Sequence, residues 1–249
     1  MKKVIYAVSA ALVIAWIPQS VDGQQESVLQ HVAEVHVKPG QEQLFEAAHA
    51  ARNERLAAAG VTFLFRSAVT EALVYRFVTP VGDYEGLARR GEEMSEVAAR
   101  APGQPNGNEA IDHVDSYLRW TRPDLGYQPE APRLETADWQ AFQRVRIYVK
   151  QGMMGEVFDV FGDIRDLYER NDVPERYTVS LQSLGSDGPI VEVQLFGSSM
   201  ADIYQVGMEL EESMGAEMNS LRLRLGPLAR RIEVDNLMIR RDMGYQPPN

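Results

Sequence analysis

The stretches WTRPDLGYQP (Trp120 to Pro129) and MIRRDMGYQP (Met238 to Pro247) share six residues in the same order, 118 positions apart. A second matched pair, VHVKPG from Val35 and IYVKQG from Ile147, is separated by 112 positions. Two matched pairs in the same order indicate an internal repeat. Because its period of roughly 115 residues is far longer than that of a solenoid repeat, the repeat is a duplicated domain. The second copy therefore holds about six additional residues between its anchors.

Outward from these anchors, both copies show the same order of secondary structure. In the first copy, apolar periodicity and turn residues predict strands over 31–38, 61–69, 72–78 and 111–121, and helices over 41–59 and from Thr79-Pro80 to about residue 100. In the second copy they predict strands over 142–149, 176–184, 189–196 and 231–240, with helices over 154–169 and from Ser199 onward. Each copy is thus a β-α-β-β-α-β, or ferredoxin-like, unit.

A ferredoxin-like unit covers one face of its sheet with helices and leaves the other face open. Two units in one chain can cover each other, so the predicted fold class is α+β, with two units forming an intramolecular α+β barrel. The predicted domains are residues 30–129 and 141–247, joined by a linker over 130–140. On element order and duplication, the chain resembles a fused, tandem form of the dimeric α+β barrel superfamily. Its members include antibiotic-biosynthesis-type monooxygenases, haem-binding chlorite-dismutase-like proteins, stress-responsive barrel proteins and NIPSNAP-like proteins.

The first 23 residues are typical of a secretory signal peptide. Lys2 and Lys3 precede an uncharged run from Val4 to Ile17, and Pro18 follows it. Because this run is shorter than the roughly 20 residues of a membrane span, it predicts export to the periplasm or medium, without stable membrane insertion after cleavage. An uncleaved N-terminal anchor is the alternative.

Composition excludes several classes of function. The 249 residues carry a formal net charge of −11 and no cysteine. The charge argues against nucleic acid as a partner, and the lack of cysteine excludes disulfides, iron–sulfur clusters and thiol nucleophiles. The sequence has no nucleophile elbow, P-loop or dinucleotide-binding glycine motif. No catalytic residue is therefore assigned, and whether the protein is an enzyme is left open, as is its oligomeric state.

Strand alternation selects candidate residues for the space between the two sheets. Val35 and Val37 in the first copy, like Val145, Ile147 and Val149 in the second, should face the helices. The opposite face then carries five polar residues: Glu34, His36, Arg144, Arg146 and Tyr148. This set favours binding of an anionic or polar small molecule.

A structural role is the alternative for these five residues, with Glu34 and Arg146 as an ion pair and His36 filling a polar interface. Two arginines beside one glutamate need a further acidic partner, because an unpaired buried charge is costly. Either Glu192 or a bound anion would supply it, and Glu192 would favour the structural role.

The residues themselves indicate no cofactor. Glu34 and His36 could begin a metal site, but no third ligand is evident, so no metal is predicted. Haem ligation by His36 or His113 follows only from the resemblance, and haem is not the expected cofactor. The sequence thus predicts an exported small-molecule-binding or interaction protein; the alternative is a cofactor-independent or haem-dependent, monooxygenase-like oxidoreductase.

Overall fold

A computed structural model describes residues 26–100, 107–185 and 188–248. The first repeat contains β1 (Leu29–Val37), α1 (Glu42–Ala58), β2 (Arg66–Thr70), β3 (Val74–Gly82), α2 (Tyr84–Arg100) and β4 (Ile111–Thr121). The second contains β5 (Ala141–Val149), α3 (Met154–Arg170), β6 (Tyr177–Leu184), β7 (Ile190–Gly197), α4 (Met200–Leu225) and β8 (Ala229–Ile239). The predicted order is confirmed in both repeats. The predicted signal peptide, residues 1–23, lies outside the described residues.

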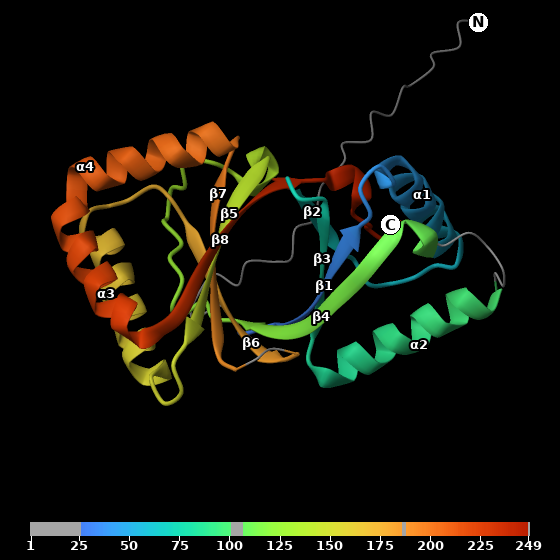
Figure 1. Cartoon of the computed structure of the whole chain (residues 1–249), viewed down its shortest axis with the longest axis horizontal. Helices are drawn as coiled ribbons and strands as arrows, with labels where there is room; N and C mark the ends of the chain where they lie inside the picture. Colours follow the sequence, from blue (N-terminus) through green and yellow to red (C-terminus); the bar gives the residue numbers. More distant parts are fainter. Residues whose placement is uncertain (1–25, 101–106, 186–187, 249) are drawn as a thin grey trace, which may run out of the picture.

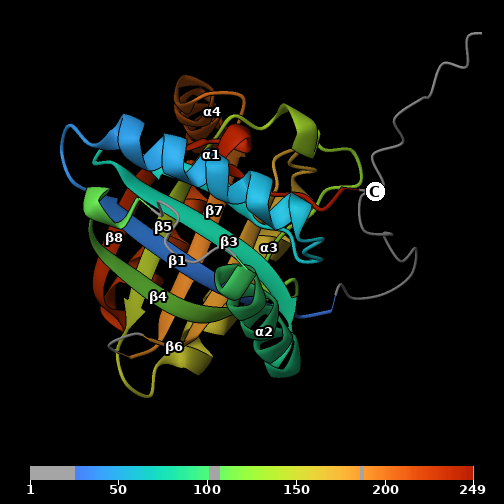
Figure 2. The same cartoon turned by 90° about the vertical axis from the view of Figure 1, so that its right-hand side faces the viewer.

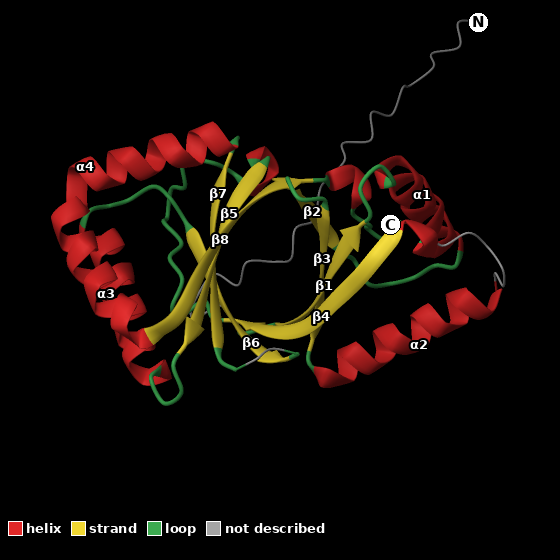
Figure 3. Ribbon diagram, in the orientation of Figure 1, coloured by secondary structure: helices red, strands yellow, loops and turns green. Residues whose placement is uncertain are grey.

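The eight strands form one closed antiparallel barrel in the order β1-β3-β2-β8-β5-β7-β6-β4. The two sheets meet at two seams, β2 with β8 and β4 with β6. The ring of strands is flanked by α1 and α2 on one side and by α3 and α4 on the other (Figures 1 and 3). Figure 2 shows α1 and α2 lying outside β1, β3 and β4. The predicted intramolecular α+β barrel is therefore confirmed.

Each repeat has its own apolar core between its helices and its sheet. Val35 and Val37 of β1 belong to a buried cluster with Phe45 and Leu56 of α1. In the second repeat, Ile147 and Val149 belong to a cluster with residues of α3 and α4. The valine and isoleucine side chains of both strands therefore face the helices, as predicted. The polar residues that alternate with them must face the barrel interior.

The repeated Gly-Tyr-Gln-Pro tails exchange between the repeats. Tyr127, which follows β4, pairs with Tyr177 of the second repeat, and Tyr245, which follows β8, pairs with Phe65 of the first. A Cβ atom on the preceding glycine would lie 3.1 Å from a backbone oxygen in both cases, that of Tyr177 for Gly126 and that of Phe65 for Gly244. Glycine recurs here because each tail packs closely on the other repeat's backbone.

One predicted helix start is wrong. Thr79 and Pro80 were expected to begin the second helix, but they lie in β3, which continues to Gly82. Proline is tolerated because β2 pairs with β3 only as far as Val78, so no hydrogen bond to β2 is lost at Pro80. The helix is capped instead by Asp83, whose Oδ1 accepts a hydrogen bond from the backbone N–H of Gly86 at 2.7 Å. The strand predicted over 61–69 likewise begins only at Arg66.

The last helix, α4, is long and bent. Ser199 caps it as predicted, with its Oγ accepting from the Asp202 N–H at 3.0 Å. Met214 has non-helical dihedral angles, φ −137° and ψ 19°, and the helix changes direction there (Figure 1). The bend lets the two halves of α4 follow both the sheet and α3. Among the described residues, no helix combines the length and apolar character needed to cross a membrane.

Candidate functional site

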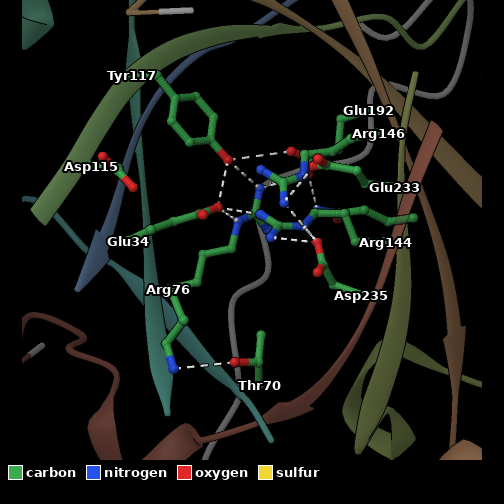
Figure 4. A network of polar contacts seen from close by, with 12 residues as sticks. Glu34, Thr70, Arg76, Asp115, Tyr117, Arg144, Arg146, Glu192, Glu233 and Asp235 are labelled. Carbon is green, nitrogen blue, oxygen red and sulfur yellow. Dashed lines mark hydrogen bonds and ion pairs between the residues drawn. The ribbon is translucent and has the colours of Figure 1, made fainter. Parts of the chain in front are cut away.

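The interior of the barrel holds a buried network of charged side chains (Figure 4). Glu192 of β7 is fully buried, and its Oε1 accepts from Arg76 Nη2 of β3 at 2.6 Å and from Gln194 Nε2 at 2.6 Å. Arg119 of β4 also donates to Glu192. Burial opposes ionisation, but the guanidinium groups of Arg119 and Arg76 hold the pKa of Glu192 well below its usual range. Glu192 is therefore a buried carboxylate anion.

Glu34 of β1 is the second buried carboxylate of the network. It accepts hydrogen bonds from Arg144 of β5 and, at 2.9 Å, from the hydroxyl of Tyr117. Burial would raise the pKa of Glu34, but Arg144 and Arg76 lower it. Burial raises the pKa of Tyr117 to about 12, so its hydroxyl stays a neutral donor between Glu34 and Glu192.

The network is charge-balanced across the two repeats. Glu34 pairs in register with Arg76, whereas at the matching positions Arg146 pairs with Glu192. The pseudo-two-fold relation thus places opposite charges at equivalent positions, so charged side chains of one sheet can form ion pairs with those of the other. Arg144 and Arg146 also contact Asp235 of β8, at 2.8 and 3.1 Å. The four guanidinium groups face four carboxylates: Arg76, Arg119, Arg144 and Arg146 with Glu34, Glu192, Glu233 and Asp235.

The positive charge of Arg144 and Arg146, which Glu34 alone would not neutralise, is balanced by further carboxylates. Glu192 supplies the acidic partner, with Glu233 and Asp235 beside it, so the interior needs no bound anion to neutralise its arginines. Each charged side chain of the network has at least one ion-pair partner, although the Nε atoms of Arg76 and Arg146 have no hydrogen-bond acceptor among the described residues. Such a network is well suited to hold two sheets in register. The geometry thus favours the structural role for Glu34, Arg144 and Arg146.

The remaining two predicted residues lie at one mouth of the barrel. Four antiparallel pairings separate β1 from β5, so the two strands run in the same direction, and His36 and Tyr148 lie near their matching ends. The Tyr148 hydroxyl donates to Glu233 at 2.8 Å, and the guanidinium of Arg231 lies 3.9 Å from the centre of its ring. Of the five predicted residues, only Glu34 and Arg144 meet directly; Arg146 and Tyr148 are linked through Glu233.

His36 is part of a group that the sequence analysis did not assemble. His36 faces His113 across β1 and β4, and their rings stack with centroids 3.8 Å apart. Asp115 lies on the same face of β4, with Oδ2 3.2 Å from His36 Nε2 and 3.8 Å from His113 Nε2. The register of two strands distant in sequence brings the three together. Arg76 and Arg119 were also missed, although an arginine within the apolar stretch VYRFV was a signal of a buried charge.

A separate cavity of about 550 Å³ lies outside the barrel, beneath α4. Its sheet side is formed by Val145, Val193 and Leu195, and its helix side includes Phe161 of α3 and Ile203 of α4. Arg176 and Tyr177 also line it, and both the Arg176 Nε and the Tyr177 hydroxyl are buried without a hydrogen-bond partner among the described residues. An apolar cavity of this size with a few polar groups has the usual character of a small-molecule site.

Comparisons with known proteins show the fold but no specific family. The chain matches no protein-family model, and no curated protein is similar to it in sequence. Among solved structures, an anthrone oxidase-like protein has a TM-score of 0.61 at 10% identity, covering 86% of this chain and 91% of its own. A proposed monooxygenase from Lactobacillus acidophilus has a TM-score of 0.55 at 8% identity, covering 89% and 97%.

A third similar structure is a chlorite dismutase variant from Candidatus Nitrospira defluvii. Its TM-score is 0.54 at 9% identity, with 87% of this chain and 93% of that chain covered. At identities this low the likeness establishes a common fold and nothing about chemistry. The chain therefore has the dimeric α+β barrel fold found in monooxygenase-like and chlorite-dismutase-like proteins.

Proposed function

We propose that this protein binds an apolar small molecule in the cavity beneath α4. The observation that carries the proposal is the cavity itself, about 550 Å³, which is partly open to solvent and lined mainly by aliphatic and aromatic side chains of the sheet, α3 and the bent α4. Water fills a partly open cavity of this kind, and a ligand that displaces this water buries the apolar lining, which is favourable.

Two features of the lining indicate that the ligand also carries a polar group. Arg176 and Arg222 line the cavity, and each brings the N–H donors of a guanidinium group to its wall. A carbonyl or phenolate oxygen on the ligand would accept from one of them. Glu211 also lines the cavity and would help to orient a polar substituent.

Oxidation of the bound molecule is the second candidate, supported by two proteins of the same fold whose names denote oxidase-like and monooxygenase chemistry. A cofactor-independent reaction suits this chain better than haem. All four histidines lie in the first repeat, and none lines the cavity. His49 is packed against Phe45, Phe65 and Phe77, and no other histidine reaches the cavity, so a histidine-ligated haem does not fit there.

The binding proposal is tested by filling the cavity. Gly207 of α4 lines it, and a Cβ atom there would meet no atom within 4 Å. We expect Gly207→Leu to abolish the fluorescence increase of anilinonaphthalene sulfonate, used as an apolar anionic probe, while the protein stays folded. Gly162→Leu on α3 is the matched control, because Gly162 has equal space but does not line the cavity. Equal probe binding by both variants would place the ligand elsewhere.

The oxidation candidate needs a separate readout. Anthrone and dioxygen would be converted to anthraquinone and water, and the product is followed by its absorbance together with oxygen uptake. Turnover that disappears in Gly207→Leu but persists in Gly162→Leu supports an enzyme using this cavity. Probe binding without anthrone turnover would instead leave a binding protein for this class of aromatic molecule.

The export of the protein and a ligand role for the five barrel residues remain predictions from sequence. Glu34, Arg144 and Arg146 are already paired, so a polar ligand would have to compete with ion pairs. Export would be tested by recovering the chain outside the cytoplasm with Gln24, or a near neighbour, as its first residue.

A further inference from the structure

We propose that His36, His113 and Asp115 form a binding site for a divalent transition-metal ion, such as Zn²⁺, at the mouth of the barrel. The site is distinct from the cavity beneath α4, because its residues come from β1 and β4 of the first repeat. The ligand set, two imidazole nitrogens and one carboxylate oxygen, is one that Zn²⁺ and neighbouring metals use in proteins.

The spacing of the donor atoms fits a shared ion. One ligand atom from each of the three residues lies within 4.8 Å of the other two. Asp115 Oδ2 is 3.2 Å from His36 Nε2 and 3.8 Å from His113 Nε2. Donors held about 2.0–2.1 Å from Zn²⁺ at tetrahedral angles are roughly 3.3 Å apart, so these distances suit one shared ion. Because the two rings stack nearly parallel, the imidazoles must turn out of the stack for both Nε2 lone pairs to point at the ion.

A fourth residue orients one of the ligands. His113 Nδ1 lies 2.8 Å from Asp112 Oδ2. If Nδ1 carries the proton and donates it to this carboxylate, the lone pair is left on Nε2, which is the atom that faces Asp115. A carboxylate behind a histidine in this way is the usual support of a metal ligand, and it raises the basicity of the imidazole.

Comparison of the two repeats shows that a histidine in the first repeat takes the place of an arginine in the second. In the second repeat, the position opposite Tyr148 is Arg231, which contacts Glu233 at 3.0 Å. In the first repeat, the position opposite His36 is His113. The ion pairs recorded for Asp115 among the described residues involve only the two histidines. A bound metal ion would supply the positive charge that Arg231 supplies in the second repeat.

The site is also accessible and incomplete. The side chains of His36, His113 and Asp115 are 30%, 53% and 63% exposed, so an ion can enter from solvent. Three protein ligands leave at least one coordination position for water or a small anion. An ion bound here would be able to take up an exogenous ligand, unlike the ion of a closed structural site.

Calorimetric titration of the tag-free protein with ZnCl₂ at neutral pH tests the proposal. We expect one equivalent to bind, and His36→Gln and His113→Gln each to weaken binding at least tenfold. His31→Gln is the matched control, since His31 is on β1 but bonds to Ser116 instead. Asp112→Asn should weaken binding by about 10–100-fold without removing a ligand.

A second measurement guards against an effect of misfolding. The same variants are titrated with Co²⁺, whose visible absorption reports the coordination geometry, and their unfolding midpoints are compared without metal. Unchanged midpoints with lost Co²⁺ absorption support the site. Zn²⁺ binding that is equal in the wild type, His36→Gln and His113→Gln would overturn it. Because neither histidine lines the α4 cavity, this outcome leaves the proposed ligand binding unaffected.

Discussion

Replacing Glu192 by Gln is the sharpest test of the buried network. The change keeps the shape of the side chain but removes a fully buried negative charge that Arg76 and Arg119 share. Breaking a buried pair by neutralising one partner costs about 3–5 kcal/mol, because the other charge is left uncompensated. For a chain of this size, that loss lowers the melting temperature by about 6–20 °C, at roughly 2–4 °C per kcal/mol.

The assay is urea and thermal denaturation of Glu192→Gln beside Glu217→Gln. Glu217 is the matched control, because it pairs with Arg170 at 3.1 Å while both side chains are more than half exposed. Such a surface pair contributes about 0–1 kcal/mol. Adding Arg119→Met to Glu192→Gln restores the charge balance and should recover part of the loss. If Glu192→Gln and Glu217→Gln were equally stable, the inference that the charges of the buried network depend on one another would be refuted.

Two further perturbations test the packing of the repeats. Burial lowers the pKa of His49 to about 4 in the folded protein. As the pH falls from 6.5 toward 4, the unfolded chain is therefore protonated at this histidine before the folded protein is. The free energy of unfolding then decreases by up to about 1.4 kcal/mol per pH unit. His49→Gln should flatten this dependence in denaturation curves, and parallel curves would contradict it. Tyr245→Ala, which removes a buried ring from the first repeat's core, should cost about 3–5 kcal/mol by the same assay, against under ~1 kcal/mol for exposed Tyr84→Ala. Equal losses would show that the exchanged tail is not anchored.

The sheet faces were predictable because alternation has a period of two, and a single apolar series fixes it. Val35 and Val37 on one side place Glu34 and His36 on the other, as the structure confirms. At Pro80, by contrast, the local pattern predicted a helix start where the structure has a strand. Proline is common at helix starts, and only the pairing of β3 shows that the residue lies beyond the end of β2.

The sequence by itself determined the duplication, the element order and the barrel, because repeated segments and periodicity are local properties of the chain. It also named Glu192 as a possible partner, since buried arginines require carboxylates. It did not determine which charges meet. Glu34 contacts Arg144, 110 residues away, and His36 meets Asp115, 79 residues away. Such contacts depend on strand register and on closure of the barrel, and the cavity beneath α4 depends on a bend at Met214. These features are set by how distant segments pack, which no local pattern of residues encodes.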